Sequence, residues 1–349
     1  MVGGTPRILI IRLSAIGDVV RVLPALQILR DAFPEAHLDW VIEPKSVAAI
    51  QGHPALDGVL LFQRPPRAID AVREFTGLCR SIRDNHYDYV LDFHGILKSG
   101  LLAWYSGAPR RIGFARPRSQ ELSYLFTNQK VQLPSPTLNR CEENHLLCKS
   151  LVQNCAWHHP LISVPYDVQD GVDAFFESTF DGGKRVIAMH VPVDRPEKEW
   201  PAEYFAELSD LLLADGRFEV VLTWGPGQFQ AVEAVLERTR RLPIVSPETV
   251  DLKHFAWLVH RAALFFGCDT GPMHIAWAMG TPVVAVFGGT DPRQHAPYEH
   301  PHRILMSGLG ATDLATARKR MRAITPQMAY DMCLEMASLP FSDQAPLTG

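Results

Sequence analysis

The stretch from residue 264 to residue 287 constrains the fold more than any other part of the chain. An apolar run over 264–268 is followed by a polar turn over 269–274, a helical pattern as far as 280, and a second apolar run over 283–287. This order predicts a strand, a turn, a helix and a second strand. That is the repeating unit of a parallel sheet with helices on both faces.

The turn at 269–274 also has the chemistry of an anion site. A helix that begins at Gly271 or Pro272 points its unpaired N–H groups and the positive end of its dipole at the carboxyl edge of the sheet. Thr270 and His274 add side-chain donors, and Asp269 lies beside them. A plainer interpretation stays open, because Asp-Thr-Gly on its own is common turn chemistry. A second small-residue turn over 288–291 follows the next strand, and adjacent loops at this edge are where doubly wound sheets bind ligands.

Strand and helix patterns alternate along the rest of the chain, which favours an α/β fold with doubly wound parallel sheets. A length of 349 residues exceeds what one core usually supports, so we expect two domains. We place the first at residues 1–160, the second at residues 161–325, and a C-terminal helix at 326–349 that crosses back to the first domain. The turn after the first strand, 14–18, lacks the Gly-x-Gly-x-x-Gly pattern, which argues against a conventional dinucleotide site.

The composition is that of an ordinary globular protein. Hydrophobic residues make up 47% and charged residues 21%, and the formal charge of -4 gives no overall nucleic-acid signature. No apolar stretch approaches the length of a membrane span, and the first residues lack the pattern of a secretory signal, so we expect a cytoplasmic protein. The six cysteines contain no Cys-x-x-Cys pair and predict neither a zinc ribbon nor a disulfide framework.

Two segments resemble a known family. Residues 10–26, which contain Gly17, Asp18 and Pro24, resemble the N-terminal signature of the ADP-heptose:lipopolysaccharide heptosyltransferases, glycosyltransferase family 9. Residues 269–274 together with 287–292 are similar to the C-terminal signature of the same family. The likeness covers nearly the whole chain.

The resemblance implies a GT-B architecture, with two Rossmann-like domains that face each other across a cleft. The first domain would hold the acceptor and the second the nucleotide-sugar. The implied reaction is an inverting, metal-independent transfer of a heptose from ADP-heptose to the inner core of lipopolysaccharide, on Kdo-lipid A. No cofactor is implied, because the ADP-sugar is a co-substrate. The residues agree with this, since there is no Asp-x-Asp motif in a strand context and His295, His300 and His302 lie in a Pro-rich loop that makes a poor metal site.

Asp18 is the predicted catalytic base. The reaction needs a group that takes the proton of the acceptor hydroxyl as its oxygen attacks the anomeric carbon. Asp18 lies at a helix start after the first strand and matches the aspartate to which the family's catalysis is attributed. Aspartate at a helix start is also a good cap, and from position alone both interpretations stay open.

The departing ADP needs donors and cations around its diphosphate. Lys198, which precedes Trp200 and Pro201, matches a family lysine near the phosphates, although alone it would be read as a solvated surface charge. The loop at 224–227 resembles the family's Trp-Gly loop near the nucleoside. The predicted donor-binding residues are Lys198, Trp224, Gly225, Gln228, Asp269, Thr270, Gly271, Pro272, Met273 and His274.

The sequence departs from the family pattern at two places. Many members have an acidic residue after the Trp-Gly loop that binds the ribose, whereas this chain has Gln228 and Gln230. Pro192 and Val193 follow His190 where some inner-core enzymes have hydroxyl side chains. Both departures leave open a GT-B enzyme with a different sugar nucleotide or acceptor. A non-catalytic sugar-nucleotide-binding protein is a third alternative, opposed by the retained Asp18 and Lys198.

The acceptor is expected to be anionic, and arginine binds carboxylates and phosphates well. The predicted acceptor-binding residues are Arg64, Arg67, Lys98 and Arg116, with Arg110, Arg111 and Arg118 on neighbouring loops. Taken as a class, these residues are most simply a solvated basic surface. Basic and aromatic residues over 110–126 raise the hypothesis of peripheral contact with the inner face of the cytoplasmic membrane. No nucleic-acid partner is expected.

Overall fold

A computed structural model describes residues 5–299, 301–309 and 313–338. The chain divides into two compact units, Met1–Ser163 and Val164–Gly349. The division falls close to the boundary that we place after residue 160. Each unit carries a six-stranded sheet in which every described strand pair is parallel.

The first unit is a doubly wound sheet with the order β3-β2-β1-β4-β5-β6. Its strands are β1 (Arg7–Ile11), β2 (His37–Ile42), β3 (Gly58–Leu61), β4 (Tyr89–Asp92), β5 (Arg110–Phe114) and β6 (Gln129–Val131). Its helices are α1 (Ile16–Val20), α2 (Leu23–Ala32), α3 (Ala68–Asp84), α4 (Leu97–Tyr105) and α5 (Arg140–Lys149), with 3-10 turns at Pro44–Ala49 and Ser123–Leu125. From β1 the chain adds β2 and β3 on one side, and it then adds β4, β5 and β6 on the other side. The loops after the neighbouring strands β1 and β4 therefore lie next to each other at the carboxyl edge of the sheet.

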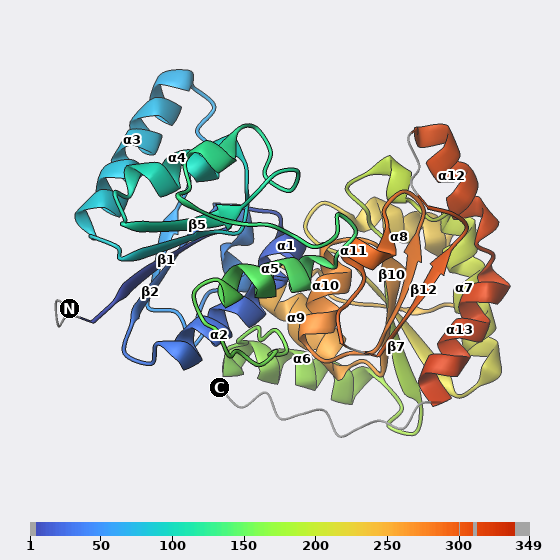
Figure 1. Cartoon of the computed structure of the whole chain (residues 1–349). Coiled ribbons are helices and arrows are strands. Elements are labelled where there is room, and N and C mark those ends of the chain that lie inside the picture. Colours follow the sequence, from blue (N-terminus) through green and yellow to red (C-terminus); the bar gives the residue numbers. More distant parts are fainter. Residues whose placement is uncertain (1–4, 300, 310–312, 339–349) are drawn as a thin grey trace. The chain divides into compact units, whose positions relative to one another are not determined.

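Helices cover both faces of this sheet. The helices α3 and α4 pack together on one face, and α2 and α5 pack together on the other (Figure 1). The central strand β1 is a continuous apolar run, and Ile8 to Ile11 have no exposed surface because helices lie above and below them.

The second unit repeats this plan with the order β12-β11-β10-β7-β8-β9. Its strands are β7 (Arg185–His190), β8 (Phe218–Thr223), β9 (Ile244–Val245), β10 (Leu264–Cys268), β11 (Val283–Phe287) and β12 (His302–Met306). Its helices are α6 (Tyr166–Thr179), α7 (Ala202–Asp215), α8 (Phe229–Leu236), α9 (Leu252–Arg261), α10 (Gly271–Ala278), α11 (Pro292–His295), α12 (Leu314–Ala323) and α13 (Pro326–Ser338), with a 3-10 turn at Pro196–Lys198. The predicted strand, turn, helix and strand at 264–287 are confirmed as β10, α10 and β11.

The segment after β1 forms two helices, α1 and α2. Pro24 lacks an N–H and its ring opposes an unbroken helix across residues 20–24. The C-terminal helix is described as far as Ser338. Its crossing to the first domain stays a prediction. Ala329, Cys333 and Met336 of α13 are part of the core of the second unit, where they pack with β10, β11, β12 and α7. Residues 339–349 lie outside the described residues.

Within the described ranges, no helix combines the length and apolar character needed to cross a bilayer.

Candidate functional site

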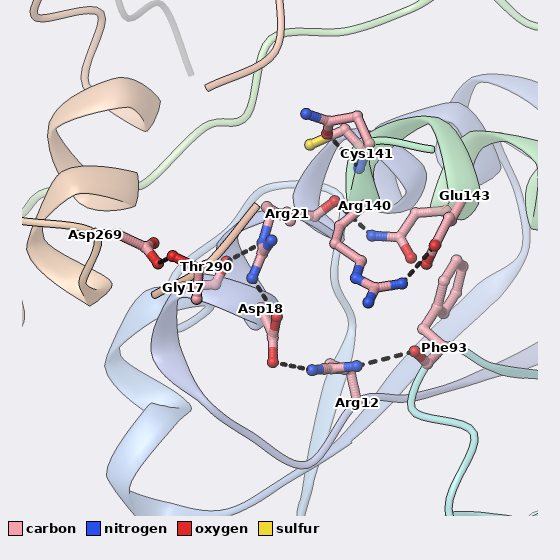
Figure 2. Close-up of polar contacts among 12 residues, drawn as sticks. Arg12, Gly17, Asp18, Arg21, Phe93, Arg140, Cys141, Glu143, Asp269 and Thr290 are labelled. Carbon is pink, nitrogen blue, oxygen red and sulfur yellow. Dashed lines mark hydrogen bonds and ion pairs between the residues drawn. The ribbon is translucent and has the colours of Figure 1, made fainter. Parts of the chain in front are cut away.

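Lys198 and Asp269 form the centre of the candidate donor site in the second unit. The Lys198 ammonium donates to the Asp269 carboxylate Oδ2 at 2.7 Å and to the Asp269 backbone carbonyl at 2.7 Å. The Thr290 hydroxyl donates to the same Oδ2 at 2.5 Å (Figure 2). Three loops that follow β7, β10 and β11 are therefore joined by one carboxylate at the carboxyl edge of the sheet.

Asp269 is 4% exposed, and its ionised form depends on these partners. Burial alone would raise the pKa of Asp269, but the Lys198 charge and the hydrogen bonds from Lys198 and Thr290 outweigh it, so the pKa is lowered. The sequence predicts Lys198 and Asp269 separately, and the structure brings them together. Thr290 was not among the predicted residues, although its position in a small-residue turn directly after β11 was a signal.

The start of α10 provides the backbone N–H groups of the predicted anion site, whereas only some of the predicted side chains are available there. The helix begins at Gly271 with Pro272 in its first turn, and no side chain caps its N-terminus. The Thr270 hydroxyl donates to the Cys268 carbonyl at 3.3 Å. The first N–H groups of the helix have no intrahelical partner and are the groups that an anion binds.

The side chains of Met273 and His274 are buried, and their predicted contact with the donor stays a prediction. Met273 has no exposed surface and His274 is 3% exposed, so both side chains lie in the interior of the unit. The physical reason is that α10 is apolar on almost every side and is covered by α9, β10 and β11. Of Met273, only the backbone N–H remains for the predicted donor contact.

The Trp224 loop is held by its own hydrogen bonds. The Trp224 indole donates to the Ser246 carbonyl at 3.0 Å and packs edge-on against Phe229, with ring centroids 4.9 Å apart. The Gln228 side-chain oxygen accepts the Gly225 N–H at 3.0 Å. The amide N–H groups of Gln228 and the second lone pair of this oxygen can still serve a ribose hydroxyl.

Asp18 is the third residue of α1 in the first unit and is paired with two arginines. Figure 2 shows Arg12 and Arg21 reaching its carboxylate from two sides. Both arginine side chains are nearly buried, whereas the Asp18 side chain is 33% exposed. The N-cap position of α1 belongs to Ala15, so Asp18 does not occupy the cap that the alternative interpretation gave it.

The two arginines fix the orientation of Asp18. The Arg12 Nη1 donates to the Phe93 carbonyl at 3.0 Å, and the Arg21 Nε donates to the Gly17 carbonyl at 3.2 Å (Figure 2). Each guanidinium is thus anchored to the backbone on one side and holds the carboxylate on the other. The two guanidinium groups compensate the negative charge of the carboxylate. The sequence contains a signal for Arg12, because it is a charged residue that directly follows a buried apolar strand.

The loop after β4 lies against the loop after β1. Asp92 is fully enclosed and accepts hydrogen bonds from the His94 N–H, the Gly95 N–H and the Ser99 hydroxyl at 2.9–3.0 Å. Burial raises the pKa of Asp92 despite these bonds. The His94 ring accepts the Leu13 N–H through Nδ1 at 3.1 Å.

The predicted acceptor-binding residues are spread over several parts of the first unit. Arg64 pairs with Glu43, while Arg67 and Lys98 are exposed. Arg116 lies over the Tyr124 ring, with 5.0 Å from its guanidinium carbon to the ring centroid. Arg110 and Arg111 are occupied locally by the Gln129 side chain and by the Ala108 and Phe126 carbonyls.

Arg116 also lines a pocket of about 320 Å³ in the first unit, together with Arg118 and Arg140. The Glu143 carboxylate at this pocket is 1% exposed and pairs with Arg118. It also pairs with Arg140 (Figure 2). Three arginines and one carboxylate line the pocket, so it suits an anion. Arg140 was not singled out by the sequence, although its partner Glu143 lies only three residues away on α5. Arg116 and Arg118 are brought to the same pocket by the fold.

Across residues 5–299, 301–309 and 313–338, no group of three or more histidine, cysteine, aspartate or glutamate side chains could hold a metal ion. His300 lies outside these ranges.

Comparisons with known proteins agree on one family. The family model described as glycosyltransferase family 9 (heptosyltransferase) matches residues 75–324. The lipopolysaccharide core heptosyltransferase OpsX of Haemophilus influenzae is 22% identical, over 83% of this chain and 81% of its own. Lipopolysaccharide heptosyltransferase 1 of Escherichia coli K12 is 26% identical, over 82% of this chain and 89% of its own. Lipopolysaccharide heptosyltransferase 1 of Pseudomonas aeruginosa is 28% identical, over 82% of this chain and 79% of its own.

Solved structures share the fold. A glycosyl transferase of family 9 from Veillonella parvula matches 97% of this chain and 98% of its own with a TM-score of 0.85 and 23% identity. The E. coli heptosyltransferase WaaC, solved with ADP, matches 95% of this chain and 99% of its own with a TM-score of 0.75 and 24% identity. The predicted GT-B fold class, with a Rossmann-like sheet in each half, is confirmed.

Proposed function

The chain belongs to glycosyltransferase family 9 (heptosyltransferase), and we propose that it transfers a heptose from ADP-heptose to the inner core of lipopolysaccharide. The observation that carries the proposal is the family match over residues 75–324, with several relatives named lipopolysaccharide heptosyltransferases along most of the chain. The solved relative with bound ADP supports an ADP-sugar as donor.

The reaction that we propose is a single inverting displacement. Asp18 takes the proton of an acceptor hydroxyl, whose oxygen forms a bond to the anomeric carbon as the bond from that carbon to the ADP oxygen breaks. The leaving ADP carries the negative charge. Arg12 and Arg21 keep the Asp18 carboxylate oriented before the transfer.

Donor binding is assigned to the second unit. The N–H groups at the start of α10 and the Lys198 ammonium supply positive charge for the diphosphate. An ammonium has three N–H donors, and Lys198 uses two of them on Asp269, so one remains for a phosphate oxygen. We therefore propose that the transfer needs neither a metal ion nor another cofactor.

Acceptor binding is assigned to the first unit. The pocket with Arg116, Arg118 and Arg140 suits a carboxylate or phosphate of a Kdo-containing acceptor. Arg64, Arg67 and Lys98 add exposed cations on other loops of the same unit. Because such an acceptor is anchored in lipid, we also propose peripheral contact at the cytoplasmic face of the inner membrane. Absence of binding to anionic liposomes at low salt in a flotation assay would remove that part of the proposal.

A different sugar nucleotide is the second candidate donor. Pro192 and Val193 offer no hydroxyl after β7, and the Gln228 oxygen is engaged by Gly225. Both features depart from the family pattern expected around an ADP-heptose donor.

The test measures ADP release by the wild type and by Asp18→Asn. The assay contains ADP-heptose, a deacylated Kdo-containing lipid A acceptor and EDTA. We expect acceptor-dependent release by the wild type and a loss of about 100-fold or more in the variant, since general bases contribute on this scale. ADP affinity, measured by calorimetry, is expected to be unchanged in the variant.

Each other result has a defined meaning. Release that needs added divalent metal contradicts metal independence. No release with ADP-heptose, together with tight binding of another nucleotide, would replace the donor and leave the family unchanged. Full activity of Asp18→Asn would exclude Asp18 as the base.

A further inference from the structure

His94 carries a hydrogen-bond donor that has no acceptor among the described residues. Its Nδ1 accepts the Leu13 backbone N–H at 3.1 Å. That bond needs an unprotonated Nδ1, so the neutral ring carries its proton on Nε2. No described residue accepts a hydrogen bond from this Nε2–H. A donor on a largely enclosed ring is thus left for a ligand or water.

The ring stays neutral over the physiological range. Burial and the positive charges of Arg12, Arg118 and Arg64 lower the pKa of His94 to about 3, and only the Asp18 carboxylate opposes this. A neutral imidazole with a fixed tautomer binds an oxygen atom without gaining a charge. His94 is therefore suited to hold a substrate and unsuited to act as a base.

The position of His94 is tied to that of Asp18. The Phe93 N–H donates to the Ile11 carbonyl at 3.1 Å, and the Phe93 carbonyl accepts the Arg12 Nη1 at 3.0 Å. The other end of the Arg12 guanidinium pairs with Asp18 (Figure 2). One guanidinium therefore connects the backbone next to His94 with the Asp18 carboxylate.

We propose that His94 binds the acceptor sugar, with its Nε2–H donating to a hydroxyl or carboxylate oxygen next to the hydroxyl that Asp18 deprotonates. The ligand class is a polyhydroxylated, acidic sugar. The proposal rests on the proposed function, because it names a contact to the acceptor of that same reaction. The role of His94 is to position the acceptor, and Asp18 remains the group that takes the proton.

A pair of substitutions tests this contact. His94→Asn keeps a polar atom near Nδ1 for the Leu13 N–H and removes the donor at Nε2. His94→Gln places an amide N–H close to the position of Nε2. We measure the affinity for the deacylated Kdo-containing lipid A acceptor by calorimetry without donor, the KM of each substrate, the pH profile of kcat/KM, and the Tm.

For His94→Asn we expect acceptor affinity to fall about 10-fold and the acceptor KM to rise by a similar factor, since an unmade polar contact has this effect. The KM for the donor should stay within about twofold. His94→Gln should recover most of the acceptor affinity, and the pH profile should keep its shape in both variants. A purely structural role predicts instead that both variants lower the Tm and affect both substrates equally.

Several outcomes overturn the proposal. Unchanged acceptor affinity in His94→Asn removes the contact. Loss of the acidic limb of the pH profile in His94→Asn would make His94 a titrating group. If the wild type binds the acceptor but transfers no heptose, the proposed donor fails, and acceptor affinity alone still decides the role of His94. If the wild type binds no acceptor, both proposals fail.

Discussion

Lys198 combines two roles at the scale of a single residue. Its ammonium neutralises the buried Asp269 carboxylate, and its remaining N–H is available to a phosphate oxygen. A single substitution removes both, so loss of activity alone cannot tell them apart. The two roles can nevertheless be separated. Stability depends on the charge balance between Lys198 and Asp269, whereas donor binding depends on the positive charge of Lys198 itself.

We predict that Lys198→Met lowers both stability and ADP affinity. Breaking a buried ion pair by removing one partner costs about 3–5 kcal/mol, because the other charge is left uncompensated. The partial exposure of Lys198, 18% of its side chain, places the expected loss at the lower end of this range. Calorimetric unfolding and titration with ADP measure the two effects.

The double variant Lys198→Met with Asp269→Asn serves as the control. It restores charge balance, so it should recover much of the lost Tm without recovering ADP affinity. Recovery of ADP affinity in the double variant would show that Lys198 acts only as the partner of Asp269.

At the scale of elements, α12 is placed against the loop that follows β11. Gly288 lies so close to this helix that a Cβ atom would overlap the Met321 side chain and approach the Ala317 carbonyl at 3.4 Å. Met321 is 1% exposed and belongs to the core, so it has little room to move. The same helix contacts the turn that carries Lys198. The absence of a side chain at Gly288 therefore sets the position of Thr290 relative to Asp269.

We predict that Gly288→Ala destabilises the protein by about 1–3 kcal/mol, the usual range for overpacking, and weakens ADP binding. Gly171→Ala is the matched control, since Gly171 lies in α6 with nothing within 4 Å of a new Cβ. That control should stabilise by about 0.5–1 kcal/mol. Thermal unfolding and ADP titration of both variants give the comparison, and a Gly288→Ala protein as stable as wild type would contradict the close packing.

At the scale of the whole molecule, buried neutral histidines make stability depend on pH. His190 is 6% exposed, with its Nδ1 and the Thr223 hydroxyl 3.0 Å apart. Burial lowers the pKa of His190 to about 3, whereas an exposed histidine titrates near 6.5. Below about pH 6.5 the unfolded chain binds a proton that the folded chain does not. Stability is therefore complete above about pH 6.5 and is lost as the pH falls toward 3.

We predict that His190→Asn reduces the loss of stability between pH 7.5 and 5.5. One histidine contributes about 1 kcal/mol over this interval, since each pH unit changes the free energy of one proton by about 1.4 kcal/mol. The measurement is denaturant unfolding at both pH values. His86→Asn is the control, because His86 is exposed and its backbone φ of 49° is one that asparagine tolerates. An equal pH dependence in wild type and His190→Asn would show that His190 is not buried in its neutral form.

The sequence alone determined the alternation of strands and helices, because apolar runs and Gly or Pro punctuation are local signals. It placed β10, α10 and β11 correctly. Its assignment of Asp18, Lys198 and Asp269 to the site stays a prediction. It could also predict that the loops after β10 and β11 share an edge, since parallel strands end on the same side.

Only the tertiary structure decided which side chains meet. The pairing of Lys198 with Asp269 joins residues that are far apart in the chain, as does the contact of Leu13 with His94. Burial of Met273 and His274 depends on the helices and strands around α10, and the packing of α13 in the second unit depends on the core that it completes. Contacts of this kind arise from packing between distant segments, and no local pattern of residue types encodes them.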